Sequence, residues 1–316
     1  MLIKPLTLNR RSILSLGAML LHGGSLARVR PAARLVIVGG AEDRLKDKVI
    51  LNRFLDLSGG FDANIVILTA ASADQLASWT GYEQVFREMG ATNTVHLPIH
   101  SMEDANAQAT VDRILNADGI FITGGDQRRL MERLWESATA RALHTAFHLR
   151  SCCIGGTSAG AAAMSRSMLA EGDTPPLPEK DAAVLGLGLG FVSNAIIDQH
   201  FSQRRRLGRL LSAIALRPDM LGIGIDEDTA LVIERGKGVE VIGRGAVTLI
   251  DGRHMRTNYF DVDASERLEM LGVALHVLPA GHSYSSRPSA RPGARSIPAS
   301  LRNAISVIVA PGPIRG

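Results

Sequence analysis

The stretch "GGTSAGAAAMS" at positions 155–165 decides the fold, because it places a serine between a strand and a helix. It follows "SCCI" at 151–154, a short apolar run typical of a buried strand. Gly156, Ser158 and Gly160 match the pattern G-x-S-x-G, in which a tight strand-to-helix turn exposes a serine hydroxyl at the edge of a sheet. An ordinary glycine-rich connection before an alanine-rich helix is the alternative, and the rest of the chain must decide between them.

From Leu35 onward, apolar runs typical of buried strands alternate with amphipathic stretches typical of helices, such as "EQVFREMG" at 83–90. The alternation predicts an α/β fold with a mostly parallel sheet that helices cover on both faces. The expected strands are "RLVIVGG", "NIVILTAAS", "TVHLPI", "GIFITGGD" and "SCCIGGTSAG", which begin at positions 34, 64, 94, 119 and 151.

Glycines end three of these expected strands. They are Gly39–Gly40, Gly124–Gly125 and the run from Gly156 to Gly160. Ligands of such sheets gather at the carboxyl ends of the strands. We therefore expect the three glycine-bearing ends to share one rim.

Composition fits a globular chain, because 316 residues that are 46% hydrophobic can bury a sizeable core. The excess of 35 basic over 31 acidic residues is small, and many arginines lie in the tails or in one cluster after residue 203, so we expect no nucleic-acid partner. Cys152 and Cys153 are adjacent and would point to opposite faces of a strand. The sequence therefore offers no disulfide framework.

The first 33 residues differ from the rest. They contain Arg10–Arg11, a short apolar run over 13–21 and the small residues of Ser25-Leu26-Ala27. This segment resembles a twin-arginine export signal, which would make the protein periplasmic or secreted. A disordered or misassigned start is the alternative, and it would leave the protein in the cytoplasm. The apolar run is too short to serve as a permanent membrane anchor.

A serine nucleophile needs a base, and "IIDQHFSQRRRLGRL" at 196–210 offers His200 at the end of another expected strand. We expect the helix that follows to carry Arg204, Arg206 and Arg209, with the last two on one face. Such a cluster is usually a solvated helix surface. Beside a nucleophile, it could hold the carboxylates of a substrate.

The third member of a triad would be a carboxylate that orients the imidazole. "GIGIDEDTALVIE" at 222–234 offers Asp226, Glu227 and Asp228 after a strand. If the strand continues into Glu227, this side chain points away from the face of Asp226 and Asp228. Alternation alone does not say which face looks at the serine.

Five segments together resemble the cyanophycinases of peptidase family S51, which also contains the aspartyl dipeptidase called peptidase E. The resemblance runs from about Leu35 to Gly252 and implies a three-layer α/β/α sandwich like that of class I glutamine amidotransferases. The segments are "VGGAED" (38–43), "GIFITGGDQ" (119–127), "GGTSAGAAAMS", "DQHFSQRRRLGRLLSAI" (198–214) and "GIGIDEDTA" (222–230). We expect a catalytic domain over 34–262. A C-terminal extension over 263–316 would hold late strands in "ALHVLPAG" (274–281) and "AISVIV" (304–309), with a segment rich in Pro, Ser and Arg between them.

The resemblance implies a Ser158 nucleophile, a His200 base and a Glu227 orienting acid, without a metal or cofactor. The oxyanion donors are expected to be the backbone N–H groups of Ala159 and of either Gly125 or Asp126. The family also suggests a homodimer. The residues that fall where the family lines its substrate pocket are Gln127, Asp198, Gln199, Arg204, Arg206 and Arg209.

The implied activity is that of a serine-type exopeptidase, which would hydrolyse cyanophycin, multi-L-arginyl-poly-L-aspartate, to β-Asp-Arg dipeptides. A peptidase E-like activity on α-aspartyl dipeptides is the nearest alternative. An esterase of the α/β-hydrolase type would instead follow the order Ser, acid, His, and would need Asp226 or Asp251 followed by His276 or His282. A non-enzymatic anion-binding module would leave the serine turn unexplained.

Between the serine turn and His200 lies "AEGDTPPLPEKD" at 170–181, which is rich in proline and acidic residues. We expect a long loop near the site. Its Glu171 and Asp173 could contact guanidinium groups of the polymer, although a solvated loop is the simpler interpretation.

Overall fold

The computed structural model describes residues 32–287 and 296–310. The predicted export signal, apart from its last two residues, lies outside these ranges, as do residues 288–295 and 311–316. Within the described ranges, no helix combines the length and the apolar character needed to cross a bilayer.

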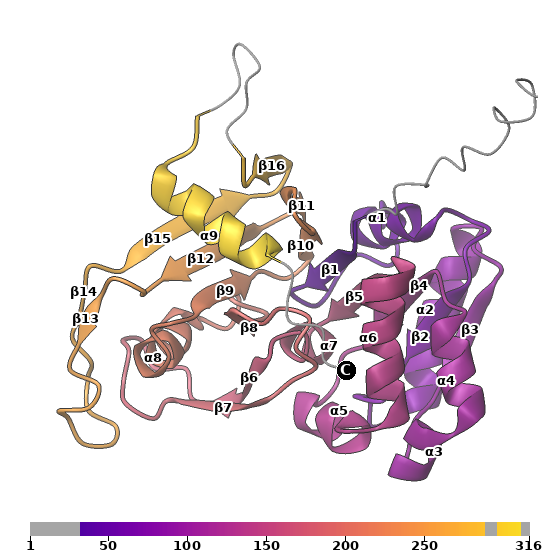
Figure 1. The fold of residues 1–316 in the computed structure, drawn as a ribbon, viewed down its shortest axis with the longest axis horizontal. Helices are drawn as coiled ribbons and strands as arrows, with labels where there is room; N and C mark the ends of the chain where they lie inside the picture. The colour runs from indigo at the N-terminus through magenta and orange to yellow at the C-terminus, as the bar shows by residue number, and fades with distance from the viewer. Residues whose placement is uncertain (1–31, 288–295, 311–316) are drawn as a thin grey trace, which may run out of the picture. The chain divides into compact units, whose positions relative to one another are not determined.

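An eight-stranded sheet forms the centre of the fold (Figure 1), in the order β16-β11-β10-β1-β5-β4-β2-β3. Five neighbouring strands from β1 to β3 are parallel, and the other three are antiparallel to their neighbours. The expected mostly parallel sheet is therefore confirmed. The bounds are β1 Arg34–Val38, β2 Ile65–Leu68, β3 Thr94–Leu97, β4 Gly119–Ile122, β5 Cys153–Thr157, β10 Thr229–Glu234, β11 Gly238–Gly243 and β16 His282–Ser285.

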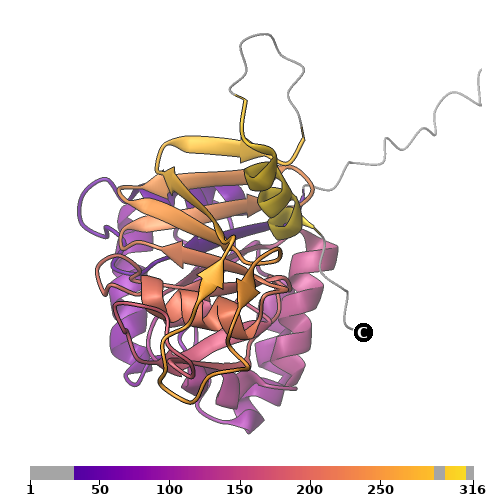
Figure 2. The ribbon, with the colours of Figure 1, turned by 90° about the vertical axis from the view of Figure 1, so that its left-hand side faces the viewer.

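Helices cover both faces of this sheet (Figures 1 and 2). Along β1, Val36 and Val38 pack into one apolar cluster with α1 and α2, whereas Leu35 and Ile37 pack into another with α3 to α6 and α9. Side chains of a strand alternate between faces, so a continuously apolar strand fits a sheet that is buried on both sides. The helices are α1 Val49–Ser58, α2 Gln75–Glu88, α3 Met102–Asn106, α4 Gln108–Leu115, α5 Gln127–Leu134, α6 Ala138–Arg150 and α9 Ala299–Val309.

A second, four-stranded sheet has the order β15-β12-β9-β8, and the sequence did not predict it. Its members are β8 Ala195–Asp198, β9 Leu221–Ile225, β12 Ala246–Asp251 and β15 Ala274–Pro279, and α8 Leu207–Leu216 packs against it. Strands β8 and β9 are parallel, so their carboxyl ends meet at the same edge. This edge supplies two of the predicted site residues.

Three shorter features complete the fold. Hairpin β6 Ser167–Gly172 and β7 Ala183–Leu187 contains the expected loop, which is confined to 173–182 because its first residues belong to β6. Helix α7 Ala159–Ala162 follows the serine. Strands β13 Arg256–Thr257 and β14 Met270–Leu271 pair with each other.

The prediction of a strand at 304–309 is wrong, because these residues lie in α9. The buried side chains of α9 are Leu301, Ala304, Ile305, Ile308 and Val309. Their spacing of three and four residues forms one helical face. The apolar run at 304–309 resembles a strand only when Leu301, one turn earlier, is left out.

Candidate active site

Ser158 occupies a strained turn between β5 and α7, with φ 52° and ψ −110°. Such a conformation costs a non-glycine residue about 1–3 kcal/mol and persists only where its surroundings hold it. The Ser158 N–H donates to the carbonyl of Val38 at 3.1 Å, which ties the turn to β1. A Cβ on Gly160 would lie 2.3 Å from the Ile122 carbonyl oxygen, and one on Gly156 would lie 2.8 Å from the Gly160 oxygen. The two glycines of the motif are therefore required by close backbone packing.

Ser158, His200 and Glu227 form a continuous row of hydrogen bonds. Ser158 Oγ lies 3.0 Å from His200 Nε2, and His200 Nδ1 lies 2.5 Å from Glu227 Oε1. His200 follows β8 and Glu227 follows β9, so the shared edge of the second sheet presents both side chains to the serine. The arrangement lets the imidazole accept the serine proton while the carboxylate holds the ring.

The glycine rim predicted from the sequence meets at this point. A Cβ on Gly40 would lie 2.3 Å from His200 Cε1, and a Cβ on Gly124 would lie 3.4 Å from Ser158 Cβ. The three strands before these turns, β1, β4 and β5, are parallel neighbours. The expectation of one shared rim is confirmed.

Burial lowers the pKa of His200 below its usual range, although the hydrogen bond and charge of Glu227 act in the opposite direction. Arg204 and Arg206 add to the lowering because they disfavour a second positive charge nearby. The imidazole is therefore neutral near pH 7 and can act as a base.

The three consecutive acids take separate positions. Asp226 accepts the backbone N–H groups of Ser202 and Ala246 at 3.1 and 3.0 Å. Asp228 accepts the backbone N–H of Asp43 at 2.8 Å and lies 3.2 Å from the Arg244 guanidinium. Both carboxylates therefore stabilise neighbouring loops by accepting hydrogen bonds from backbone N–H groups.

Strand alternation is not the reason for this separation. Strand β9 ends at Ile225, two residues before Glu227, and the chain then turns through Asp228, whose φ is 46°. The Glu227 N–H donates to Gln203 Oε1 at 3.0 Å. The turn and this side chain, which the sequence did not single out, set the position of Glu227.

One candidate oxyanion donor is already engaged. The Asp126 N–H donates to the Ala71 carbonyl at 3.0 Å, and the Asp126 carboxylate caps α5. Within the described part of the chain, no acceptor pairs with the backbone N–H of Gly125 or Ala159. Of the predicted donors, Gly125 and Ala159 remain available.

Four of the six predicted pocket residues form one buried cluster beside the serine. The Asp198 carboxylate, 1% exposed, accepts from Arg209 Nε at 3.0 Å and from Arg206 Nη1 at 3.3 Å. Arg206 Nη1 also reaches Gln199 Oε1 at 3.1 Å, and this oxygen lies 3.5 Å from Ser158 Oγ. Burial lowers the pKa of Arg206 to about 10, which still leaves it charged.

The other two pocket residues lie elsewhere. Arg204 is exposed in the turn before α8, because this helix begins at Leu207 and not at the arginines as expected. Gln127 Nε2 donates to the carbonyls of Leu169 and Ala170 at 3.3 and 2.5 Å, which attaches the β6–β7 hairpin to α5.

Sequence reasoning missed a buried trio beneath the serine turn. Glu42 accepts a hydrogen bond from Thr157 Oγ1 at 2.6 Å and another from the Tyr82 hydroxyl. All three side chains are buried, and Thr157 directly precedes Ser158. The available signal was an acid two residues after Gly40, inside the motif "VGGAED".

The structure supports neither Cys153 as the nucleophile nor the Ser, acid, His order of an esterase. Burial raises the pKa of the Cys153 thiol to about 12, so this thiol is inert as a nucleophile. Asp251 pairs with Arg253 at 2.6 Å, and the His282 ring contacts its own neighbour, the Ala280 carbonyl. Among the described residues, no group of three or more His, Cys, Asp or Glu could hold a metal ion.

The sequence model of peptidase family S51 matches residues 35–242. The chain belongs to peptidase family S51. Cyanophycinase from Synechococcus elongatus is 38% identical over 254 residues, 80% of this chain and 79% of that protein. Cyanophycinase from Geminocystis herdmanii is 38% identical over 257 residues, 80% of this chain and 93% of that protein.

A solved structure adds a likeness of fold to this S51 assignment. The crystal structure of a peptidase from an acI-B1 actinobacterium superposes with a TM-score of 0.57 at 21% identity, covering 81% of this chain and 98% of the other. As an S51 member, the protein is a peptidase, a hydrolase of peptide bonds.

Proposed function

We propose that this S51 peptidase degrades cyanophycin through a Ser158–His200–Glu227 triad. The observation that carries the proposal is the hydrogen-bonded row of 3.0 and 2.5 Å that starts at a serine with a strained backbone. The choice of cyanophycin as the substrate is supported by relatives that are 38% identical and are named cyanophycinases.

In this mechanism, Ser158 Oγ attacks a backbone carbonyl of the polymer while His200 Nε2 takes the serine proton. The carbonyl oxygen becomes an oxyanion that receives hydrogen bonds from the N–H groups of Gly125 and Ala159, worth about 3 kcal/mol each. His200 then gives its proton to the amine of the leaving part of the chain, and the part that ends in the attacked carbonyl stays on Ser158 as an acyl-enzyme. Water hydrolyses this ester with His200 again as the base. When the attacked bond joins a terminal unit to the rest of the polymer, the two steps together release that unit as a β-Asp-Arg dipeptide.

The buried cluster beside the serine fits a substrate that carries carboxylates. Arg206 and Arg209 share the single carboxylate of Asp198, so the three side chains keep one excess positive charge. A desolvated positive charge attracts an anion much more strongly than an exposed arginine does. The cluster therefore places one excess positive charge beside the serine, where it can attract a free carboxylate of the polymer.

The test is to incubate the purified protein with cyanophycin and, separately, with α-aspartyl dipeptides, and to identify the products by mass spectrometry. We expect β-Asp-Arg from the polymer and no cleavage of the dipeptides. Cleavage of the dipeptides with the polymer left intact would contradict the proposal and favour a peptidase E-like activity. The Ser158→Ala variant controls for contaminating peptidases.

A further inference from the structure

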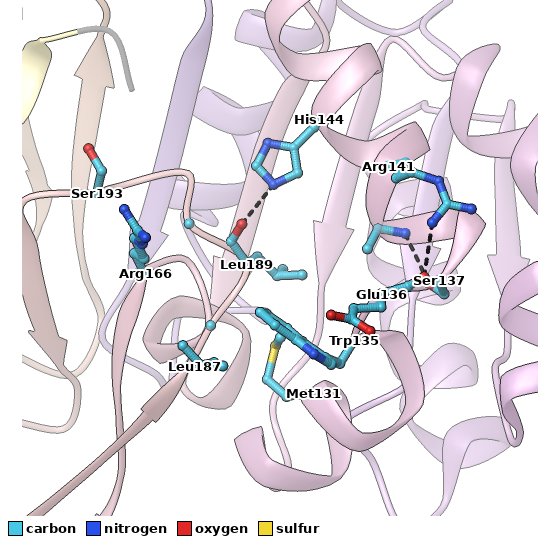
Figure 3. Close-up of a pocket in the computed structure, with 13 residues that line it drawn as sticks. Met131, Trp135, Glu136, Ser137, Arg141, His144, Arg166, Leu187, Leu189 and Ser193 are labelled. Carbon is cyan, nitrogen blue, oxygen red and sulfur yellow. Dashed lines mark hydrogen bonds between the residues drawn. The ribbon is translucent and has the colours of Figure 1, made fainter. Parts of the chain in front are cut away.

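A pocket of about 440 Å³ lies outside the serine site, between the α5–α6 junction and the base of the β6–β7 hairpin (Figure 3). Its apolar wall includes Met131, Trp135, Leu187 and Leu189. The Leu187 side chain is 56% exposed, so the apolar wall of the pocket reaches the surface. We call this cavity the Trp135 pocket.

Charges of both signs surround the Trp135 pocket, since Glu136, Arg141 and Arg166 also line it (Figure 3). Arg141 Nη1 donates to the Glu136 carbonyl at 2.9 Å and so fixes the backbone that carries the Glu136 carboxylate. Within the described ranges, no ion pair engages either the Glu136 carboxylate or the Arg166 guanidinium.

The backbone at Glu136 is strained as well. Its φ of 58° is left-handed, in the short turn between α5 and α6. A non-glycine residue pays for this conformation, and such residues gather at binding sites. The turn therefore sets the backbone position of Glu136, whose side chain lines the pocket.

We propose that the Trp135 pocket binds a second arginyl-aspartate unit of the same polymer chain whose end is cleaved at Ser158. This inference rests on the proposed function. Each unit presents a guanidinium and a free carboxylate on an apolar stem. The guanidinium fits the Trp135 ring and the Glu136 carboxylate, and the carboxylate fits Arg166.

The distance between the two sites suits a chain of a few units. Helix α5 begins at Gln127, three residues after the glycine that lies beside Ser158, and ends at Leu134, one residue before Trp135. The distance that matters here is the one to Trp135 and Glu136, which lie beyond the lining residue Met131. Eight helical residues span about 12 Å. An extended aspartate backbone advances about 3.5 Å per residue, so about four units connect the sites. A chain bound at the pocket raises the local concentration of its own cleavable end.

A comparison of long and short substrates distinguishes binding at the Trp135 pocket from bond cleavage at Ser158. Steady-state kinetics would be measured with cyanophycin and with a two-unit oligomer that is too short to reach the pocket. For Trp135→Ala and Glu136→Gln, we expect KM for the polymer to rise about fivefold or more, with kcat unchanged and with kcat/KM for the two-unit oligomer within twofold of wild type. Glu132→Gln, an exposed glutamate on α5 that does not line the pocket, is the matched control and should behave as wild type.

Three results would overturn the inference. One is a wild-type KM for the polymer in both pocket variants. Another is an equal loss on both substrates, which would mark a structural role. If the wild-type enzyme cleaves neither substrate, the proposed function fails and the inference fails with it, whereas the first two results leave the proposed function standing. Glu136→Gln keeps the size of an exposed side chain, so its result does not depend on the folding of Trp135→Ala.

Discussion

Replacing Glu227, the carboxylate that faces His200, should lower activity much more than replacing its neighbours Asp226 or Asp228. Glu227 contacts the imidazole, whereas Asp226 and Asp228 bind backbone N–H groups of adjacent loops. Glu227→Gln keeps the size but loses the charge that stabilises imidazolium, so we expect kcat to fall at least about 10²-fold. Asp228→Asn should change kcat only slightly, and the two variants would be compared in the same polymer assay. A crippled Asp228→Asn beside an active Glu227→Gln would show that the acid is misassigned.

The buried Thr157–Glu42 hydrogen bond gives a second prediction at the same scale. Because Glu42 holds the residue before Ser158, Thr157→Val should lower kcat about tenfold through a loosened serine turn, with KM unchanged. Thr157→Ser keeps the hydroxyl and should restore most of the rate. The pair of kcat values tests the idea, since equal losses in both variants would assign the effect to packing and not to the hydrogen bond.

His200 makes the activity depend on pH in a stated direction. The base must be neutral, so kcat/KM should rise with pH through the pKa of His200 and then level off. Because burial lowers that pKa, the midpoint should lie below the usual value of about 6.5. Glu227 raises the pKa of the ring, so Glu227→Gln should move the midpoint to still lower pH. A midpoint clearly above 6.5 in the wild-type profile would contradict this account.

At the scale of elements, the sequence predicted the strands of the parallel sheet well, because each is a continuous apolar run before a turn. It missed the second sheet, because pairing between β8, β9, β12 and β15 joins segments far apart in the chain and leaves no local pattern. It also misplaced the start of α8 and with it the environment of the arginines. The cluster of arginines in the sequence is typical of a solvated helix surface, but the fold buries Arg206 and Arg209 and brings Asp198 between them.

Asp198 at the end of β8 binds Arg206 and Arg209, so its substitution should lower the free energy of unfolding by several kcal/mol. Asp198→Asn leaves two buried guanidinium groups without their carboxylate, and breaking a buried pair in this way costs about 3–5 kcal/mol. Urea denaturation of the Ser158→Ala and Asp198→Asn proteins would compare a site variant with a structural one. A free energy of unfolding for Asp198→Asn within about 1 kcal/mol of wild type would show that solvent or the cluster itself compensates the lost charge.

At the scale of the whole molecule, the candidate site exists because two sheets meet. The His200 N–H donates to the Gly39 carbonyl at 2.7 Å, and the Gly39 N–H donates to the Thr229 carbonyl at 2.9 Å, so β1 lies directly under the loops that carry the base and the acid. The motif resemblance selected Ser158, His200 and Glu227 without knowledge of this junction. Their distances, and the supporting roles of Glu42 and Gln203, follow only from the way in which the sheets pack.

The most direct test of Ser158 as the nucleophile is the rate at which Ser158→Ala releases β-Asp-Arg from cyanophycin. This rate would be compared with that of wild type at equal concentrations of folded protein. Ser158 is half-buried, and its hydroxyl contacts only His200 and Gln199 among the described side chains. Alanine keeps the Cβ of Ser158, so the variant should fold normally. Without the nucleophile, the rate should fall at least about 10³-fold. A Ser158→Ala protein that still releases the dipeptide at a rate near wild type, or a loss of activity in Cys153→Ala instead, would contradict the account.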